Sequence, residues 1–335
     1  MPNKIRFGII GCSRIAEGST IPAIVNSKFS ELKIIGSRSK EKAEKFAKKF
    51  NCKEFGSYED VLENKDVDAV YISLPVGLHE EWTVKAAQAG KHILCEKSLT
   101  TSYRSAYKMV ESCKKNNVRL MEGLMFRFHP QHKKVLEFVR NGSLGKIFLF
   151  NGQYGLPPVP HDDIRQNKNL GGGVLNDAGC YPICASRIVF GEPSSVFCNL
   201  VINKDTKVDE KANLCLKYDD SRFAQITVGY DLYYQSTYSV WGSQGMLKLT
   251  RSYNIPADMN AMLILHSSKD GREISVGAYN HYVLMIDSFC HEITGNNQRE
   301  FNFEEDLLKQ AKIMEAARIS DREKCFVDIE EIEKK

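Results

Sequence analysis

Two kinds of segment alternate along the first third of the chain, one of them short and apolar and the other longer and amphipathic. The short apolar runs, which predict buried strands, cover residues 5–10, 32–36, 68–73, 92–95 and 118–121. The longer amphipathic stretches, which predict helices, cover residues 40–50, 76–89 and 102–116. Strands that alternate with helices form a doubly wound parallel sheet, which binds ligands at the carboxyl ends of its strands. We therefore expect an α/β domain over residues 1–122.

The pattern changes after residue 122, where strand signals predominate. The predicted strands cover residues 146–154, 194–202, 212–218, 222–230, 236–241, 246–250, 262–267, 272–276 and 325–329. The predicted helices cover residues 131–142, 282–294 and 304–319. This predicts an α+β domain over residues 123–335 with a large, mostly antiparallel open sheet, whose C-terminal helices can pack back on the first domain.

Composition is typical of an ordinary globular protein, with 42% hydrophobic and 26% charged residues. The net charge of +4 is small and its basic residues are scattered, which does not indicate nucleic-acid binding. No apolar run approaches the roughly 18 residues of a membrane span. The first strand follows the N-terminus too closely for a signal peptide, and the ten cysteines include no Cys-x-x-Cys pair. We expect a cytoplasmic protein with reduced thiols and no metal site.

A glycine-containing turn follows the first predicted strand, in the stretch Gly11-Cys12-Ser13-Arg14-Ile15-Ala16. It is a degenerate form of the dinucleotide-binding fingerprint, in which Gly11 makes the tight turn and Ala16 lets the helix approach the strand. Ser13 replaces the glycine that usually lets the backbone approach a pyrophosphate. A second strand follows and completes a βαβ unit, which favours the dinucleotide interpretation.

The second strand ends at Ser37-Arg38-Ser39, where an NAD-binding unit usually has an acidic residue for the ribose 2′-hydroxyl. Hydroxyl groups and a guanidinium instead suit the 2′-phosphate of NADP. The alternative is an exposed basic loop without a ligand. We expect NADP as the cofactor, with NAD less favoured.

Two further stretches carry candidate chemistry. Lys97 comes directly after a buried strand, at the edge where ligands bind. The stretch from Gly171 to Tyr181 begins with three glycines, which mark a tight turn or a close approach of the backbone, and places Asp177 and Tyr181 four residues apart. Pro182 predicts the first turn of a helix that ends at Gly191. The alternative is a structural loop capped by Asp177, with Tyr181 half buried.

With these motifs in order, the chain resembles the Gfo/Idh/MocA family of nicotinamide-dependent oxidoreductases along nearly its whole length. The stretches that carry the resemblance are Gly8–Ala16, Tyr71–Pro75 with His79 and Trp82, Cys95–Lys97, Met125–Pro130 and Gly171–Tyr181. The resemblance implies an N-terminal Rossmann domain and a C-terminal domain whose open sheet often forms the oligomer interface. Ser98 stands where the family usually has proline.

The resemblance also implies roles for residues. Lys97 takes the position of the family's lysine beside the nicotinamide, Asp177 that of its aspartate, and Tyr181 that of the acid/base tyrosine found in some branches. The expected cofactor-binding residues are Gly11, Cys12, Ser13, Arg14, Ile15, Ser37, Arg38, Ser39, Leu74, Pro75, His79, Glu96 and Lys97. The expected substrate-binding residues are Arg127, His129, Arg165, Asp177 and Tyr181.

We therefore expect an NADP-dependent oxidoreductase that transfers a hydride to or from a sugar or a nucleotide-linked sugar, with Lys97 and Tyr181 as the acid/base pair. One alternative is a dehydrogenase of a free aldose or a trans-dihydrodiol, and another is a non-catalytic dinucleotide-binding regulator. The aromatic residues of 223–241 predict a homodimer or homotetramer formed through the C-terminal sheet.

Overall fold

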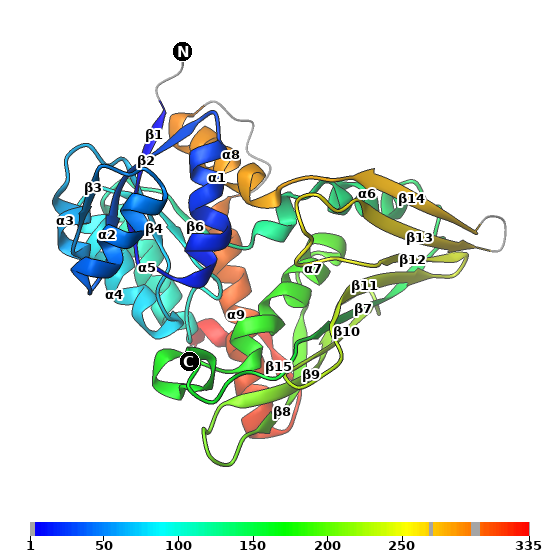
Figure 1. Cartoon of the computed structure of the whole chain (residues 1–335). Helices are drawn as coiled ribbons and strands as arrows, with labels where there is room; N and C mark the ends of the chain where they lie inside the picture. Colours follow the sequence, from blue (N-terminus) through cyan, green and yellow to red (C-terminus); the bar gives the residue numbers. More distant parts are fainter. Residues whose placement is uncertain (1–3, 268–270, 296–301, 335) are drawn as a thin grey trace. The chain divides into compact units, whose positions relative to one another are not determined.

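Two compact units make up the chain in this computed structural model, which describes residues 4–267, 271–295 and 302–334 (Figure 1). The first unit contains the chain up to Met125 together with Tyr282–Leu308. The second contains Phe126–His281 and the chain from Lys309 onward.

A six-stranded parallel sheet forms the centre of the first unit, in the order β3-β2-β1-β4-β5-β6 among the described residues. Its strands are β1 (Ile5–Ile10), β2 (Ser30–Gly36), β3 (Glu54–Gly56), β4 (Ala69–Ile72), β5 (His92–Cys95) and β6 (Leu120–Glu122). The central strands are mostly apolar and buried, apart from Arg6 on β1, because helices cover both faces of the sheet (Figure 1). The predicted doubly wound parallel sheet is confirmed.

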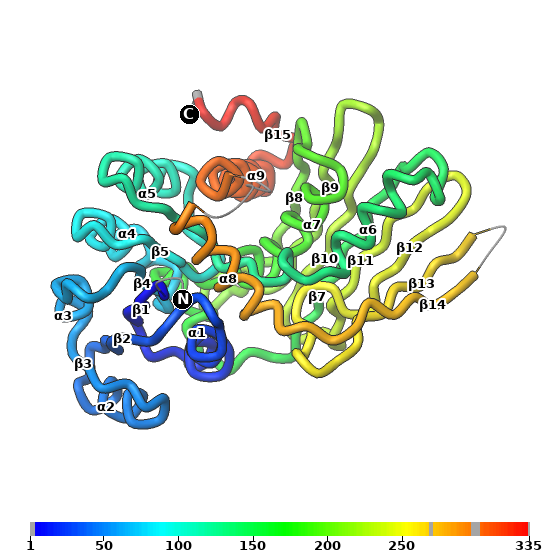
Figure 2. Tube along the Cα trace, turned by 90° about the horizontal axis from the view of Figure 1, so that it is seen from above, coloured from blue at the N-terminus to red at the C-terminus, as the bar shows by residue number. Residues whose placement is uncertain are grey.

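Helices connect these strands and cover the sheet. They are η1 (Ala16–Thr20), α1 (Ile21–Asn26), α2 (Lys40–Lys49), α3 (Tyr58–Glu63), η2 (Val76–Leu78), α4 (His79–Gln88), α5 (Tyr103–Lys115), α8 (His281–Thr294) and the start of α9 (Phe303–Glu323). Helices α1 and α8 lie side by side, where Ser27 Oγ donates to Asp287 Oδ1 at 2.5 Å (Figure 2). The unit thus recruits a helix from late in the chain.

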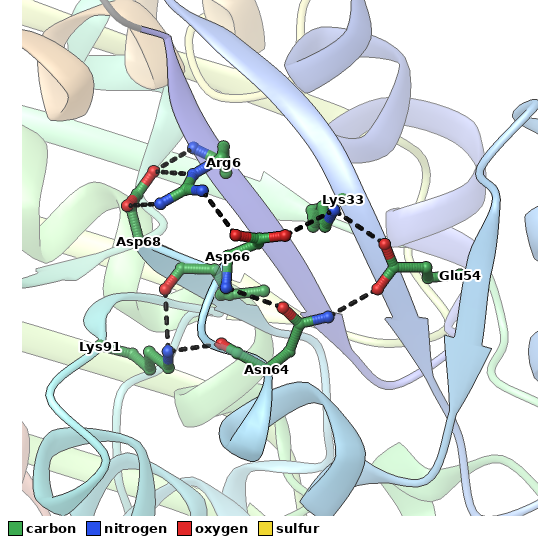
Figure 3. Close-up of polar contacts among 8 residues, drawn as sticks. Arg6, Lys33, Glu54, Asn64, Asp66, Asp68 and Lys91 are labelled. Atoms are coloured by element: carbon green, nitrogen blue, oxygen red, sulfur yellow. Dashed lines mark hydrogen bonds and ion pairs between the residues drawn. The ribbon is translucent and has the colours of Figure 1, made fainter.

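A network of charged side chains ties the amino-terminal end of this sheet together (Figure 3). Arg6 on β1 donates from Nε and Nη2 to the two carboxylate oxygens of Asp68, at 2.9 and 2.8 Å. Lys33 on β2 pairs with Glu54 and Asp66. Lys91 is buried, which lowers the pKa of its amine, and its Nζ donates to the carbonyl oxygens of residues 64 and 67 at 2.7 and 2.9 Å. The network holds the strands together at their amino-terminal ends, away from the carboxyl ends where ligands bind.

The second unit is built on a nine-stranded sheet, in the order β14-β13-β12-β11-β7-β10-β9-β8-β15 within the described part of the chain. Its strands are β7 (Ile147–Gly155), β8 (Ser195–Ile202), β9 (Asp209–Lys217), β10 (Phe223–Gly229), β11 (Gln235–Gly242), β12 (Gly245–Leu249), β13 (Ala261–Ser267), β14 (Gly271–Gly277) and β15 (Val327–Asp328). The pairs are antiparallel except for β7 with β10. The expected mostly antiparallel sheet is confirmed.

Helices cover one face of this second sheet. The helical elements are η3 (Met125–Phe128), α6 (Pro130–Arg140), η4 (Ile164–Gln166), η5 (Lys168–Leu170), η6 (Leu175–Gly179), α7 (Cys180–Phe190), the rest of α9 and η7 (Ile329–Lys334). Helix α7 packs on β7 and β10, and α6 packs on β13 and β14. Between helices and sheet lies an aromatic core in which Phe150 and Tyr238 stack with ring centroids 5.0 Å apart. No helix among the described residues is long and apolar enough to span a membrane.

Candidate active site

The turn after β1 is tight, as its glycine predicts. Gly11 has a φ of +107°, and a Cβ at this position would lie 2.6 Å from the carbonyl oxygen of Ser73. Ser13 Oγ accepts a hydrogen bond from the backbone N–H of Ala16 at 3.1 Å and also contacts the hydroxyl of Ser73. Ser13 therefore caps the helix that follows and links the ends of β1 and β4, which is why a serine fits where the fingerprint usually has glycine.

The end of β2 presents a guanidinium and no carboxylate at residues 37–39. Ser37 is buried and its Oγ accepts from the N–H of Ser39, whose own Oγ accepts from the N–H of Lys42 at the start of α2. Arg38 is exposed. Burial of the Tyr58 phenol raises the pKa of that group, and the charge and hydrogen bonds of Arg38 partly offset this increase. The tight Gly11 turn and the exposed Arg38 fit a dinucleotide that carries a 2′-phosphate.

The loops after β4 and β5 are joined by His79, which lies at the start of α4 and is fully buried. Its Nε2 lies 2.8 Å from the carbonyl oxygen of Leu74, and its Nδ1 lies 3.1 and 3.0 Å from those of Ser98 and Leu99. Burial lowers the pKa of the His79 imidazole. These contacts hold the backbone on which Pro75 and Lys97 lie.

Lys97 follows β5 on a loop held by buried carboxylates. Glu96 accepts from the N–H of Lys97 at 3.2 Å and from the phenol of Tyr71 at 2.5 Å. Glu122, at the end of β6, accepts from the N–H of Leu99 at 2.8 Å. The peptide bond between Lys97 and Ser98 is cis. Glu122 was not among the predicted site residues, although its place at the carboxyl end of a strand was a usable signal.

The glycine-rich stretch of the second unit leads into a helix that begins earlier than predicted. Helical backbone starts at Val174, continues through η6 and passes into α7, so Pro182 lies inside the helix and the expected start at Pro182 is wrong. The cap comes from a distant strand: Asp209 Oδ2 on β9 accepts from the N–H of Leu175 at 2.6 Å. A sequence pattern cannot reveal a cap that lies 34 residues away. The predicted end at Gly191 is confirmed.

Asp177, on η6, lies among polar groups. Tyr230 donates from its phenol to Asp177 Oδ2 at 3.3 Å, and Arg165 Nη1 lies 3.6 Å from the same oxygen. Arg165 is also bound by Asp163, whose carboxylate accepts from Nε at 2.9 Å and from Nη2 at 3.0 Å. Arg165 and Asp177 are thus brought together, whereas Asp163 and Tyr230 were missed by the sequence analysis.

Tyr181 lies about one helical turn after Asp177 and is 5% exposed. Its ring packs against Phe126, Tyr154 and Tyr253, with centroids 5.7, 5.4 and 5.9 Å away. This packing fixes the direction of the phenol ring. Tyr181 belongs to the second unit and Lys97 to the first.

Arg127 and His129 precede α6 in the second unit. Arg127 lies on η3 and is partly exposed. His129 is fully buried, and its Nδ1 accepts from the N–H of Gln131 at 3.2 Å. Burial lowers the pKa of His129 to about 4, so its ring is neutral at pH 7 and caps α6.

The remaining site chemistry is that of carboxylates, phenols and amines. All ten cysteines are free thiols. Within residues 4–267, 271–295 and 302–334 no group of three or more His, Cys, Asp or Glu side chains is arranged to hold a metal ion. The predicted cofactor-binding residues of the first unit lie at the carboxyl ends of β1, β2, β4 and β5 or on the helix that begins there.

Comparison with known proteins decides the family. A model described as "Oxidoreductase family, NAD-binding Rossmann fold" matches residues 5–124, and the GFO/IDH/MocA C-terminal domain matches residues 132–248. The chain belongs to the Gfo/Idh/MocA oxidoreductase family. It is therefore an oxidoreductase, and its first unit carries the NAD-binding Rossmann fold of this family.

Similar proteins cover most of the chain or nearly all of it. A dTDP-3,4-didehydro-2,6-dideoxy-alpha-D-glucose 3-reductase from Actinomadura kijaniata is 34% identical over 97% of this chain and 98% of its own length. D-xylose 1-dehydrogenase (NADP(+)) 2 from Haloferax volcanii is 34% identical over 80% of this Gfo/Idh/MocA chain and 82% of its own. The crystal structure of a 3-ketoreductase from Actinomadura kijaniata in complex with NADP and TDP-benzene has a TM-score of 0.91 at 33% identity, covering 95% of this chain and 98% of that one.

Proposed function

We propose that this chain reduces a keto group of a nucleotide-linked sugar with NADPH. The observation that carries the proposal is its likeness, over both units, to the 3-ketoreductase with bound NADP and TDP-benzene. The two family models match the turn after β1 and the helix with Asp177 and Tyr181. A dehydrogenase of a free aldose is the second candidate. The xylose dehydrogenase has the same sequence identity to this chain as the dTDP-sugar 3-reductase, 34%, although over a shorter length.

The residues of the first unit would hold the cofactor. Gly11, Ser13 and the start of the following helix suit the pyrophosphate, and Arg38 with the hydroxyls beside it suits the 2′-phosphate. We include Cys12, Arg14, Ile15, Leu74, Pro75 and Glu96 among the residues of the cofactor site. When bound, the nicotinamide supplies the hydride.

The residues on the substrate side handle protons and orientation. A keto oxygen gains negative charge as it is reduced, so a proton donor must lie within hydrogen-bond reach. We assign this role to the phenol of Tyr181, whose ring is already fixed by packing. An ammonium such as that of Lys97 favours the phenolate left after proton transfer. Asp177 accepts a hydrogen bond from a sugar hydroxyl and so orients the ring.

A turnover assay tests this function directly. Purified protein should oxidise NADPH in the presence of a 3-keto dTDP-sugar, measured by the loss of absorbance at the wavelength of the reduced nicotinamide. Turnover of a free aldose alone would favour the second candidate. Binding of NADPH without turnover of either class would favour the regulator.

The two units divide these tasks. We assign dinucleotide binding to residues 1–122 and substrate binding and oligomerisation to residues 123–335, in a cytoplasmic protein. Tyr282–Leu308 lies in this second range of the sequence but belongs to the first unit. Nothing in the charge pattern favours nucleic acid or membrane as a partner.

A homo-oligomer formed through the nine-stranded sheet is supported by the face that carries no helix. Phe223 on β10, Trp241 on β11 and Met246 on β12 flank the same register as Leu149 on β7, which places four apolar side chains side by side. Trp241 is 56% exposed, whereas Tyr230 and Tyr238 are buried within the unit. An exposed apolar patch of this kind usually marks an interface. A monomer in light scattering at micromolar concentration would exclude the homodimer or homotetramer.

A further inference from the structure

Arg165 is held by a carboxylate that is itself buried. Asp163 accepts from Nε and Nη2 of the guanidinium and from the backbone N–H of Arg165, at 2.9, 3.0 and 3.0 Å. The side chain of Asp163 is only 6% exposed. A bidentate pair of hydrogen bonds between an arginine and a carboxylate fixes the plane of both groups. The hydrogen bonds to Asp163 raise the pKa of Arg165 above its usual value.

The third guanidinium nitrogen is directed at Asp177. Nη1 lies 3.6 Å from Asp177 Oδ2, and the phenol of Tyr230 donates to the same oxygen at 3.3 Å. Tyr230 is 2% exposed, so its position is set by the core. The other carboxylate at this helix entry, Asp209, is occupied by the N–H of Leu175. Two groups from different segments thus fix one oxygen of Asp177.

The glycines of the motif bring the Arg165 loop to this place. The N–H of Gly173 donates to the carbonyl oxygen of Arg165 at 2.9 Å. A Cβ at Gly172 would overlap that same carbonyl oxygen. The second glycine therefore allows the loop with Asp163 and Arg165 to lie against the helix that carries Asp177.

We propose that Asp163, Arg165 and Tyr230 are positioning residues that hold Asp177 as an oriented carboxylate, ready to accept a hydrogen bond from a sugar hydroxyl. The inference rests on the proposed function. It changes the role expected for Arg165 from a substrate-binding residue to one that holds Asp177, because its guanidinium is already engaged by two carboxylates. With two negative charges and one positive, the cluster favours a hydroxyl donor over an anion.

Replacing Arg165 tests the proposal through pH. The Arg165 guanidinium beside Asp177 favours the ionised carboxylate. Arg165→Met should therefore move the acid limb of the kcat/KM profile to higher pH. Tyr230→Phe should give a smaller shift in the same direction. A role confined to stability would lower activity at every pH without moving the limb.

Asp163→Asn and Asp220→Asn form a matched pair of variants. Arg222 Nε also binds an aspartate two residues earlier, at 2.6 Å from Asp220 Oδ2, on a hairpin of the same unit. Asp163→Asn should loosen the guanidinium and raise KM for the sugar more than it lowers kcat. Asp220→Asn should leave the pH profile and KM unchanged, and an equal effect of both variants would overturn the proposal.

A titration without substrate separates this inference from the proposed function. In protein labelled with ¹³C at aspartate carboxyl carbons, the signal lost in Asp177→Asn assigns Asp177. Its titration midpoint should move to higher pH in Arg165→Met, because the positive charge beside the carboxylate is removed. An unmoved midpoint would overturn the positioning role even in an active enzyme. A moved midpoint in a protein without sugar turnover would leave the positioning intact and reject the proposed function.

Discussion

Tyr181 offers a phenol whose ring is fixed and whose proton can be removed without changing the packing. Tyr181→Phe keeps the contacts with Phe126 and Tyr154 and deletes only the hydroxyl. General acid groups contribute about 10²- to 10⁴-fold, so kcat with the 3-keto sugar should fall within that range. NADPH binding, measured by fluorescence titration, should stay nearly unchanged.

Lys97 provides the matching test. If Lys97 and Tyr181 act as a unit, Lys97→Ala should cost at least as much as Tyr181→Phe, and the double variant should be little worse than the poorer single one. Losses that multiply in the double variant would show that the two residues act independently. Full activity of Tyr181→Phe would mean that another group donates the proton.

Arg38 is the residue on which cofactor choice depends. A hydrogen bond to a charged group contributes about 1.5–3 kcal/mol, which corresponds to roughly tenfold to a hundredfold or more in affinity. Arg38→Ala should therefore weaken NADPH by this factor and leave NADH nearly unchanged, as measured by titration of each. Equal or tighter binding of NADH by the unmodified protein would contradict the NADP assignment.

At the scale of elements, the entry of the helix with Asp177 and Tyr181 depends on Gly173. This glycine has a φ of +113°, and a Cβ there would overlap the carboxylate of Asp209 that caps Leu175. Gly191, at the other end of the same helix, has a φ of +84° with open space around a Cβ. A side chain would strain the backbone at both positions, but only at Gly173 would it also meet a steric conflict.

Gly173→Ala should therefore destabilise more than Gly191→Ala. Backbone strain alone costs about 1–3 kcal/mol, which is the expected effect of Gly191→Ala on the free energy of unfolding in urea. Gly173→Ala should exceed it and also lower turnover, because displacing Asp209 uncaps the helix. Equal losses of stability with full turnover in both variants would show that the cap does not matter.

The elements found from the sequence are those with a strong periodic pattern. All five predicted strands of the first sheet and its long helices are present, because each buries an uninterrupted apolar run or stripe. Strand β3 was missed because three residues carry no period. Helix α3 was missed although Ser57 and Asp60 form a capping box, with Ser57 N–H to Asp60 Oδ2 at 2.7 Å and Asp60 N–H to Ser57 Oγ at 3.1 Å.

Some residues of the candidate site can likewise be predicted from a local sequence pattern, and others cannot. Residues that follow a strand or a glycine turn, such as Lys97 and Asp177, can be found because position along the pattern places them at a ligand-binding edge. Tyr230 and Asp209 could not, since each acts on the helix entry from another part of the chain. Asp163 could not either, because it acts on Asp177 only through Arg165. Contacts across 34 or 53 residues follow from the completed sheet and leave no local pattern.

At the scale of the whole molecule, three buried histidines make folding sensitive to acid. Burial lowers the pKa of His129 to about 4 and that of His132 and His281 to about 3. His132 Nδ1 lies 2.8 Å from the phenol oxygen of Tyr238, and the rings of His129 and His281 are 6.3 Å apart. Charging any of them in the folded state would put an imidazolium into the aromatic core.

The sign of the pH effect follows from these directions. An unfolded histidine titrates near pH 6.5, so below that pH the unfolded chain binds protons that the folded chain rejects until about pH 4 or 3. Stability is therefore complete above pH 6.5 and is lost as the pH falls, by up to about 1.4 kcal/mol per pH unit for each histidine.

Urea denaturation at pH 7.5, 6, 5 and 4.5 measures this loss. A glutamine at position 132 cannot take up a proton, so His132→Gln should reduce the dependence of the unfolding free energy on pH by about one proton. His161→Gln, at an exposed loop position, should leave that dependence unchanged. Parallel curves for the unmodified protein and His132→Gln would show that His132 carries no part of the acid sensitivity.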